Sequence, residues 1–120
     1  MPLATTIEEV QMYARKVSMQ LKPNSAAALT QRFENDIIPL LRKQKGFQDE
    51  INFITAGGKE AFAISLWDRT EDAEAYSRAT YPQVVKLLTT VVEGTPRVET
   101  YEVSNSTFHK LPAAVAPASR

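Results

Sequence analysis

Residues 57–76, GGKEAFAISLWDRTEDAEAY, contain the stretch that decides the fold. Gly57 and Gly58 can turn the chain at positive φ without steric cost. Between residues 61 and 67 large and small side chains alternate, and a period of two is typical of a strand. The large residues are Phe62, Ile64 and Leu66, and the small ones are Ala61, Ala63 and Ser65. We expect helices to cover the large face, and the small face, with Trp67 at its rim, to leave room for a ligand.

The same periodicities assign the other elements. Strands are predicted at 11–21, 47–54, 61–67 and 97–103, where apolar residues alternate with polar ones or form short buried runs. An amphipathic helix is predicted from Asn24 or Ser25 to Lys45, with a bend near 35–39 caused by Pro39. A second helical region, capped by Asp68 or Thr70, is predicted in two pieces at 70–80 and 82–93 because Tyr81-Pro82 interrupts it.

This order of elements, strand, helix, strand, strand, helix, strand, predicts an α+β protein with the ferredoxin-like βαββαβ arrangement. Four antiparallel strands would form a sheet with the helices on one face. The other face would stay uncovered, which is unusual for a small domain with an apolar sheet, so we expect a second copy to pack against it as a homodimer. Residues 11–105 form the predicted domain, 1–10 a lead-in and 106–120 a flexible tail.

Composition excludes several classes of function. The 120 residues suit a single domain, and 14 basic residues balance 14 acidic ones, which argues against nucleic acid or an anionic membrane as a partner. The chain has no cysteine and a single histidine, His109, so disulfides, thiolate catalysis and a multi-histidine metal site are excluded, and no metal is predicted. The sequence lacks a long apolar run and a recognisable signal peptide, which favours a cytoplasmic protein.

Four landmarks give the chain a resemblance to a known family. They are Tyr13-Ala14-Arg15, Ile38-Pro39-Leu40, Gly46-Phe47 and the run from Trp67 to Asp72. In this order and spacing they resemble the antibiotic-biosynthesis-monooxygenase-like (ABM) domains of the dimeric α+β barrel superfamily, over about residues 11–105. The resemblance implies a homodimeric barrel. It also implies a candidate activity, cofactor-independent oxygenation of an electron-rich aromatic such as a quinol or a polyketide phenol, with no cofactor and a small aromatic ligand as partner.

The sequence departs from the active members of this family at two positions. Quinol and anthrone oxygenases tend to place an asparagine four residues before the tryptophan, where this chain has Ala63. Haem-degrading members have an iron-binding histidine about ten residues after the tryptophan, and the corresponding residue here is Ser77. A non-catalytic ligand-binding or structural homodimer of the same fold therefore stays open as the alternative function.

Seven residues are candidates for the site: Arg15 and Tyr76 for catalysis, and Trp67, Asn52, Ser65, Ala63 and Tyr81 for substrate binding. Arg15 has a fork of donors that can hold a phenolate or carboxylate, although it could instead pair with Glu99 or Glu102 on the fourth strand. Trp67 could stack on a flat ligand or fill the core or the dimer seam. The tyrosines and Asn52 could orient a ligand hydroxyl or serve packing alone. His109 lies beside the tail and is expected to be solvated.

Overall fold

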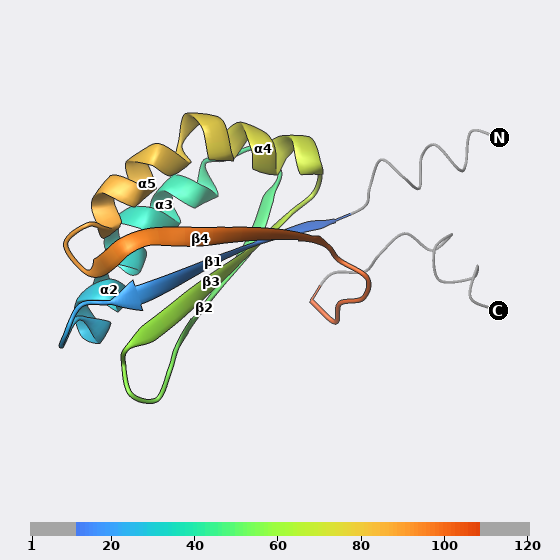
Figure 1. Cartoon of the computed structure of the whole chain (residues 1–120). Helices are drawn as coiled ribbons and strands as arrows, with labels where there is room; N and C mark the ends of the chain where they lie inside the picture. The colour runs from blue at the N-terminus through green and yellow to red at the C-terminus, as the bar shows by residue number, and fades with distance from the viewer. Residues whose placement is uncertain (1–11, 109–120) are drawn as a thin grey trace, which may run out of the picture.

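The computed structural model describes residues 12–108. Strands β1 (Tyr13–Leu21), β2 (Phe47–Ile54), β3 (Glu60–Trp67) and β4 (Val92–Glu102) form one antiparallel sheet in the order β2-β3-β1-β4. The helical segments α2 (Ala26–Arg32), η1 (Phe33–Ile37), α3 (Ile38–Arg42), α4 (Thr70–Ala79) and α5 (Tyr81–Leu88) lie on one face of it (Figure 1). The predicted α+β, ferredoxin-like fold is therefore confirmed. The predictions for residues 1–10, for His109 and for most of the tail concern residues outside this described range.

The prediction of which face of β3 the helices cover was wrong. Ala61, Ala63 and Trp67 belong to the buried core together with the helix residues Leu29 and Phe33. Small side chains on this face let the helical layer approach the sheet closely and leave room for larger side chains from β1 and the helices. The large residues of β3 point to the opposite face, which has no helical layer.

The first helical region contains a π-helical turn, η1, immediately before Pro39. Proline has no N–H to donate to the preceding turn, and a π-turn is one way in which a helix accommodates such a defect. The bend was predicted near 35–39, and the irregular turn of the structure spans Phe33–Ile37, which overlaps that range only in part. Because Phe33 and Ile37 of this turn are buried, it also decides which side chains the region contributes to the core.

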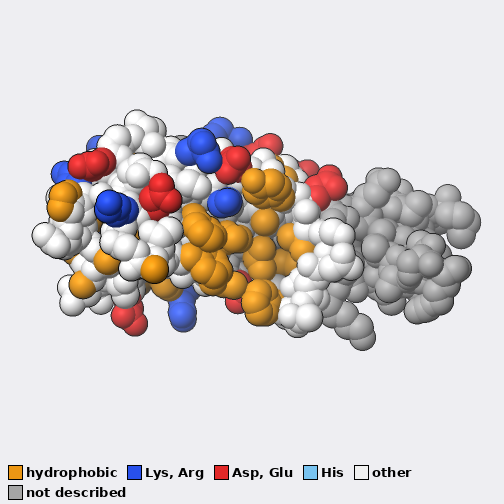
Figure 2. All heavy atoms as spheres, turned by 60° about the horizontal axis from the view of Figure 1, so that its bottom comes forward, with side chains coloured by type: hydrophobic (Ala, Val, Ile, Leu, Met, Phe, Trp, Pro, Cys, Tyr) orange, Lys and Arg blue, Asp and Glu red, His pale blue; other side chains and the backbone are white. Residues whose placement is uncertain are grey.

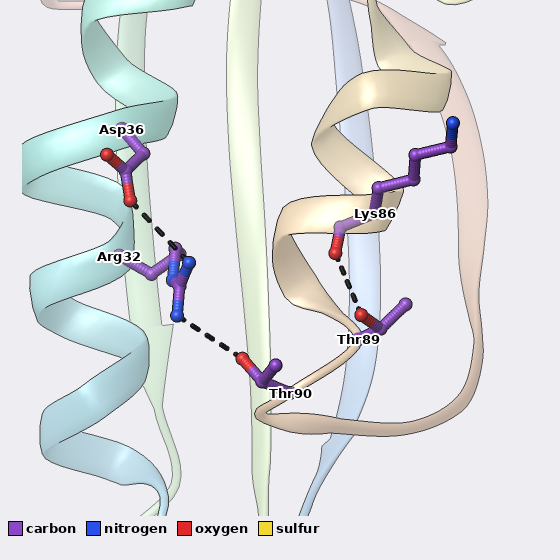
Figure 3. A network of polar contacts seen from close by, with 5 residues as sticks. All are labelled: Arg32, Asp36, Lys86, Thr89 and Thr90. Atoms are coloured by element: carbon purple, nitrogen blue, oxygen red, sulfur yellow. Dashed lines mark hydrogen bonds and ion pairs between the residues drawn. The ribbon is translucent and has the colours of Figure 1, made fainter.

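Arg32, at the junction of α2 and η1, connects this region to the loop before β4 (Figure 3). Its Nη1 lies 3.7 Å from Oδ2 of Asp36, and its Nη2 donates to Oγ1 of Thr90 at 3.3 Å. In the same loop the hydroxyl of Thr89 donates to the carbonyl of Lys86 at 2.8 Å and closes the end of α5. Arg32 thus joins the first helical region to the loop that follows α5.

Two predicted boundaries need correction. The last helix ends at Leu88 and β4 begins at Val92, so Gly94 and Pro96 lie inside a strand and do not terminate a helix. β4 is an edge strand and its pairing with β1 is shifted between Ser18 and Gln20, where a glycine at φ +68° and a proline can be accommodated. At α4, the N-cap residue is Arg69, not Asp68 or Thr70, and no side chain caps the helix.

Hydrophobic side chains gather on the face of the sheet that the helices leave open (Figure 2). Phe53 of β2 stacks on Phe62 of β3 with ring centroids 4.7 Å apart, and Lys16 Nζ lies 4.9 Å from the centroid of Phe62. Phe53 is 43% exposed and Tyr101 of β4 is 48% exposed. Within residues 12–108, no helix is long and apolar enough to span a membrane.

Candidate functional site

A small cavity lies between the inner face of the sheet and the helical layer. Its volume is about 20 Å³, which is room for one water molecule. Strand β3 forms part of its floor through its small residues, and η1, α4 and α5 supply larger side chains. The lining residues are Arg15, Val17, Phe33, Ile37, Leu41, Glu50, Ala63, Ser65, Tyr76, Tyr81, Val84 and Leu88.

Arg15 is the buried cation of this cavity. Its side chain points inward from β1 and the residue is only 4% exposed. Its Nε donates a hydrogen bond to the hydroxyl of Ser77 at 2.9 Å. Its guanidinium carbon lies 4.1 Å from the ring centroid of Tyr81 and 5.1 Å from that of Tyr76. Two aromatic rings and one hydroxyl therefore stabilise a charge that burial would otherwise disfavour.

Arg15 does not form the alternative ion pair with the fourth strand. Its partner in the β1–β4 register is Thr100, whereas Glu99 lies opposite Lys16 and Glu102 opposite Tyr13. Glu99 instead lies 3.9 Å from the exposed Arg97. Within residues 12–108, no carboxylate lies within ion-pair distance of Arg15. The guanidinium therefore forms no direct ion pair, although Glu50 lines the same cavity and is close enough for Arg15 to lower its pKa.

Trp67 lies behind the cavity wall and does not line it. It is fully buried, and its indole Nε1 donates to the hydroxyl of Ser65 at 2.8 Å. Its ring lies 5.1 Å from the Tyr76 ring and 5.6 Å from the Phe47 ring, measured between centroids. The position predicted at an open rim was wrong, because the helices cover this face of β3. Trp67 holds Ser65 and Tyr76 in place from behind.

Tyr76 and Tyr81 bring two phenolic hydroxyls to the cavity. Burial raises the pKa of both groups above the ordinary value of 10, and the nearby Arg15 opposes this rise. The hydroxyl of Tyr81 is buried and forms no well-aligned hydrogen bond, although Arg15 is close enough to lower its pKa. A buried donor without a partner is costly, and a ligand oxygen or a water in the cavity would satisfy it.

Glu50 is the functional candidate that sequence reasoning missed. It lies opposite Ser65 in the β2–β3 register and lines the cavity with Arg15. Burial raises the pKa of Glu50 from 4.5 to about 8, and the Arg15 guanidinium opposes the rise. The place of Glu50 on the same strand face as Asn52 was the signal that could have identified it.

Five of the seven predicted residues line the cavity: Arg15, Ala63, Ser65, Tyr76 and Tyr81. Asn52 does not. It is exposed and lines a separate groove between β2 and the first helical region, with Thr30 and Glu34. Among residues 12–108, no group of three or more metal-ligating side chains comes together.

Comparisons with known proteins identify the fold. No protein-family model matches the chain, and a search of curated proteins found no match. A protein of unknown function from Nitrosomonas europaea, NE2512, is similar at 19% identity and a TM-score of 0.68, over 88% of this chain and 98% of that one. A proposed antibiotic biosynthesis monooxygenase from Bordetella bronchiseptica is similar at 13% identity and a TM-score of 0.67, over 79% and 99%.

A third similar structure contains a ligand. It is a monooxygenase from the gene ActVA-Orf6 of Streptomyces coelicolor in complex with nanaomycin D, with 10% identity, a TM-score of 0.69, and coverage of 83% of this chain and 94% of that one. At these identities the likeness concerns the fold. The chain has the fold of an antibiotic-biosynthesis-monooxygenase-like domain.

Proposed function

We propose that this protein is a cofactor-independent monooxygenase that acts on an electron-rich hydroxylated aromatic compound. The observation that carries the proposal is Arg15, a buried cation that forms no ion pair in the described part of the chain and shares a cavity with Tyr76, Tyr81 and Glu50. Burial of a charge without an ion pair lowers the stability of a fold, so packing alone does not explain it. Groups with perturbed pKa values that gather in one cavity are typical of functional sites.

The reaction needs a substrate that can reduce dioxygen itself. Loss of the hydroxyl proton gives a phenolate, which transfers electrons to oxygen far more readily than the neutral phenol does. One oxygen atom of O₂ then becomes a carbonyl on the ring carbon, and the other leaves as water with the hydrogen atoms of the O–H and C–H bonds. The protein has to bind the ring, stabilise the anion and keep out bulk water.

Each cavity residue has a role in this proposal. Arg15 holds the ionised oxygen through its guanidinium, and Tyr81 donates its unpaired hydroxyl to the same oxygen. Tyr76 is the second hydroxyl donor, while Ala63 and Ser65 form the floor under the ring. Trp67 acts from behind by fixing Ser65 and Tyr76. The proposed substrate contact of Asn52 is dropped from this site because its groove is separate.

A substrate requires the cavity to open. Pockets for drug-sized ligands measure roughly 300–1,000 Å³, whereas this cavity has about 20 Å³. Phe33 and Ile37, which line it, belong to the π-helical turn, and such turns are frequent at functional sites. We propose that a shift of η1, together with rotation of the Arg15 side chain off the Tyr81 ring, admits the ligand.

The small volume favours a second candidate function, a non-catalytic or structural dimer whose interior is mostly packed. The two candidates differ in what Arg15 does. Oxygen uptake should be measured with a panel of hydroquinones, naphthols and anthrones for the natural protein, for Arg15→Met and for Arg78→Met, which removes an exposed charge from α4. The monooxygenase predicts uptake that Arg15→Met abolishes and Arg78→Met leaves unchanged. Uptake that Arg15→Met retains would contradict the role of Arg15, whereas no uptake by the natural protein would favour the structural dimer.

The proposed partner is a second copy of the chain. The open face of the sheet exposes aromatic side chains of β2 and β4 around the Phe53–Phe62 pair. Water in contact with such a surface is unfavourable, and an apolar sheet face of this kind is commonly an interaction site. Two copies packed face to face would cover both faces at once.

A further inference from the structure

Glu50 lies at the boundary between the buried cavity and a groove on the surface. The groove has a volume of about 480 Å³ and runs between α3 and β2. It is lined by Ile38, Arg42, Phe47, Gln48, Asp49 and Glu50. Glu50 is the one described residue that lines both this groove and the cavity of Arg15. Glu50 therefore lies between the interior and the surface groove at this side of the sheet.

The groups around Glu50 come from every neighbouring element. On the cavity side are Arg15 of β1, Tyr76 of α4 and Tyr81 of α5. Glu50 is close enough to Tyr76 for its charge to contribute to the raised pKa of that phenol. On the groove side the charged groups are Arg42 of α3 and Asp49, which precedes Glu50 on β2. A proton on Glu50 can thus reach the cavity from one side and water from the other.

We propose that Glu50 is the base that accepts the hydroxyl proton of a phenolic ligand bound against Arg15, and that it passes this proton to solvent through the groove between α3 and β2. The step is a proton transfer. The O–H bond of the ligand breaks, its electron pair stays on the ligand oxygen beside Arg15, and the proton forms a new O–H bond on Glu50. This inference rests on the proposed function, since it assigns the base of the same site.

Elimination among the cavity residues supports this assignment. The cavity residues with ionisable side chains, in the described part of the chain, are Arg15, Glu50, Tyr76 and Tyr81. Arg15 has no free base form near neutral pH, and the raised pKa values keep both tyrosines protonated as donors. Glu50 remains. Burial places its pKa at about 8, closer to that of a phenol than an exposed carboxylate would be, which favours proton transfer between them.

The test counts protons with beta-naphthol as the probe, a phenol whose neutral and ionised forms absorb at different wavelengths. Titration calorimetry in buffers of different ionisation heats gives the number of protons released on binding, and absorbance gives the form that is bound. At about pH 8.5 most Glu50 is ionised, while a phenol with a pKa near 10 is mostly neutral. We expect bound naphtholate with almost no net proton release, because Glu50 takes the proton.

Variants make the expectation sharper. Glu50→Gln resembles the protonated residue, so it should bind naphtholate and release about one proton per ligand at the same pH. Glu74→Gln, which removes an exposed carboxylate from α4, should behave as the natural protein does. The natural protein offers a test without any variant. Its proton release should fall from about one to near zero as the pH rises through about 8, the pKa of Glu50.

The outcomes separate the two proposals. The natural protein could bind naphtholate and release a full proton at about pH 8.5. The proton would then go directly to solvent, which would overturn the role of Glu50 but leave Arg15 as the anion site. Binding of neutral naphthol also overturns the role of Glu50. Absence of saturable binding, or equal binding by Arg15→Met, overturns the proposed function together with this inference.

Discussion

The guanidinium carbon of Arg15 lies 4.1 Å from the ring centroid of Tyr81, in a cavity where no described carboxylate pairs with it. A cation–π contact stabilises a buried charge by about 2 kcal/mol, less than the cost of removing that charge from water. The Ser77 hydroxyl adds one hydrogen bond. The arrangement therefore keeps a positive charge ready at the expense of stability, which is expected of a binding site and not of a packed core.

Arg15→Met tests this trade-off. Replacement of a buried charge by an apolar side chain of similar length removes the desolvation cost, so the free energy of unfolding should stay unchanged or rise by about 1–2 kcal/mol. Binding of beta-naphtholate should weaken at least about tenfold, the effect of losing one charge-assisted hydrogen bond. Urea denaturation and titration calorimetry measure the two quantities.

Arg78→Met is the matched control because it removes the same charge from an exposed position on α4. It should change neither stability nor binding appreciably. A loss of several kcal/mol in Arg15→Met would mean that the guanidinium is a structural element, and would contradict the trade-off.

Glu50 should make the protein less stable as the pH rises. Its pKa is raised from 4.5 to about 8 in the folded state, so the native protein binds the proton more tightly than the unfolded chain does. The contribution to stability is complete below pH 4.5 and is lost as the pH rises through about 8. Its size is on the order of a few kcal/mol. Denaturation at a series of pH values should show this decline, and Glu50→Gln should flatten it.

The stability of Glu50→Gln relative to the natural protein tests the direction of this pH dependence. Above pH 8, Glu50→Gln should be more stable than the natural protein, because the glutamine carries no charge to bury. Parallel stability curves for the two proteins would show that Glu50 keeps an ordinary pKa, and the proposed base would lose its basis. Glu74→Gln serves as the control, because Glu74 lies exposed on α4.

Ser65 and Trp67 should be energetically coupled. The indole N–H donates to the Ser65 hydroxyl at 2.8 Å, and both residues are buried. Ser65→Ala leaves that donor without a partner and should cost about 1–3 kcal/mol, whereas in a Trp67→Phe background the same change should cost much less. Denaturation of the two single variants and the double variant measures the coupling. Additive losses would show that the hydrogen bond contributes nothing.

The order of elements could be predicted from the sequence because strand and helix leave different periodicities. Arg15 could be selected as a candidate as well, because its fork of donors suits an anionic ligand. The orientation of β3 could not be deduced from alternation alone. A strand with large residues on one face and small residues on the other fits a helical layer on either side, and the choice depends on volumes supplied by distant helices. Trp67 was misplaced for the same reason.

Glu50 was missed because its significance depends on its surroundings. A glutamate in a polar strand is ordinarily solvated, and only the register that sets it opposite Ser65 and near Arg15 makes it a half-buried acid with a raised pKa. The boundary of β4 failed for a topological reason. Gly94 and Pro96 are turn signals in most contexts, but an edge strand tolerates them. Edge and centre cannot be assigned before the strand order is known.

Gly46 should be sensitive to substitution although it lies far from Arg15 in sequence. It adopts φ +79°, and a Cβ atom at this position would collide with the carboxylate of Asp72 at the start of α4. Its carbonyl also accepts a hydrogen bond from the Asp68 N–H at 2.8 Å. Gly46→Ala should therefore lower the free energy of unfolding by about 1–3 kcal/mol. In the hairpin turn, Gly57 has no atoms within 4 Å of such a Cβ, so Gly57→Ala should be nearly neutral in the same denaturation experiment.

The open face of the sheet gives the last prediction, that the protein is a dimer in solution and that Ile64→Lys makes it a monomer. Ile64 lies in the middle of this face, opposite Lys16 on β1 and Ile51 on β2. A lysine there would add a charge beside Lys16, and burying both in a sheet-to-sheet interface would be unfavourable. Ala75→Lys adds the same charge to the exposed surface of α4 and should leave the dimer intact. Light scattering at micromolar concentration measures the mass. A monomeric natural protein, or a dimer that Ile64→Lys leaves unchanged, would contradict the interface.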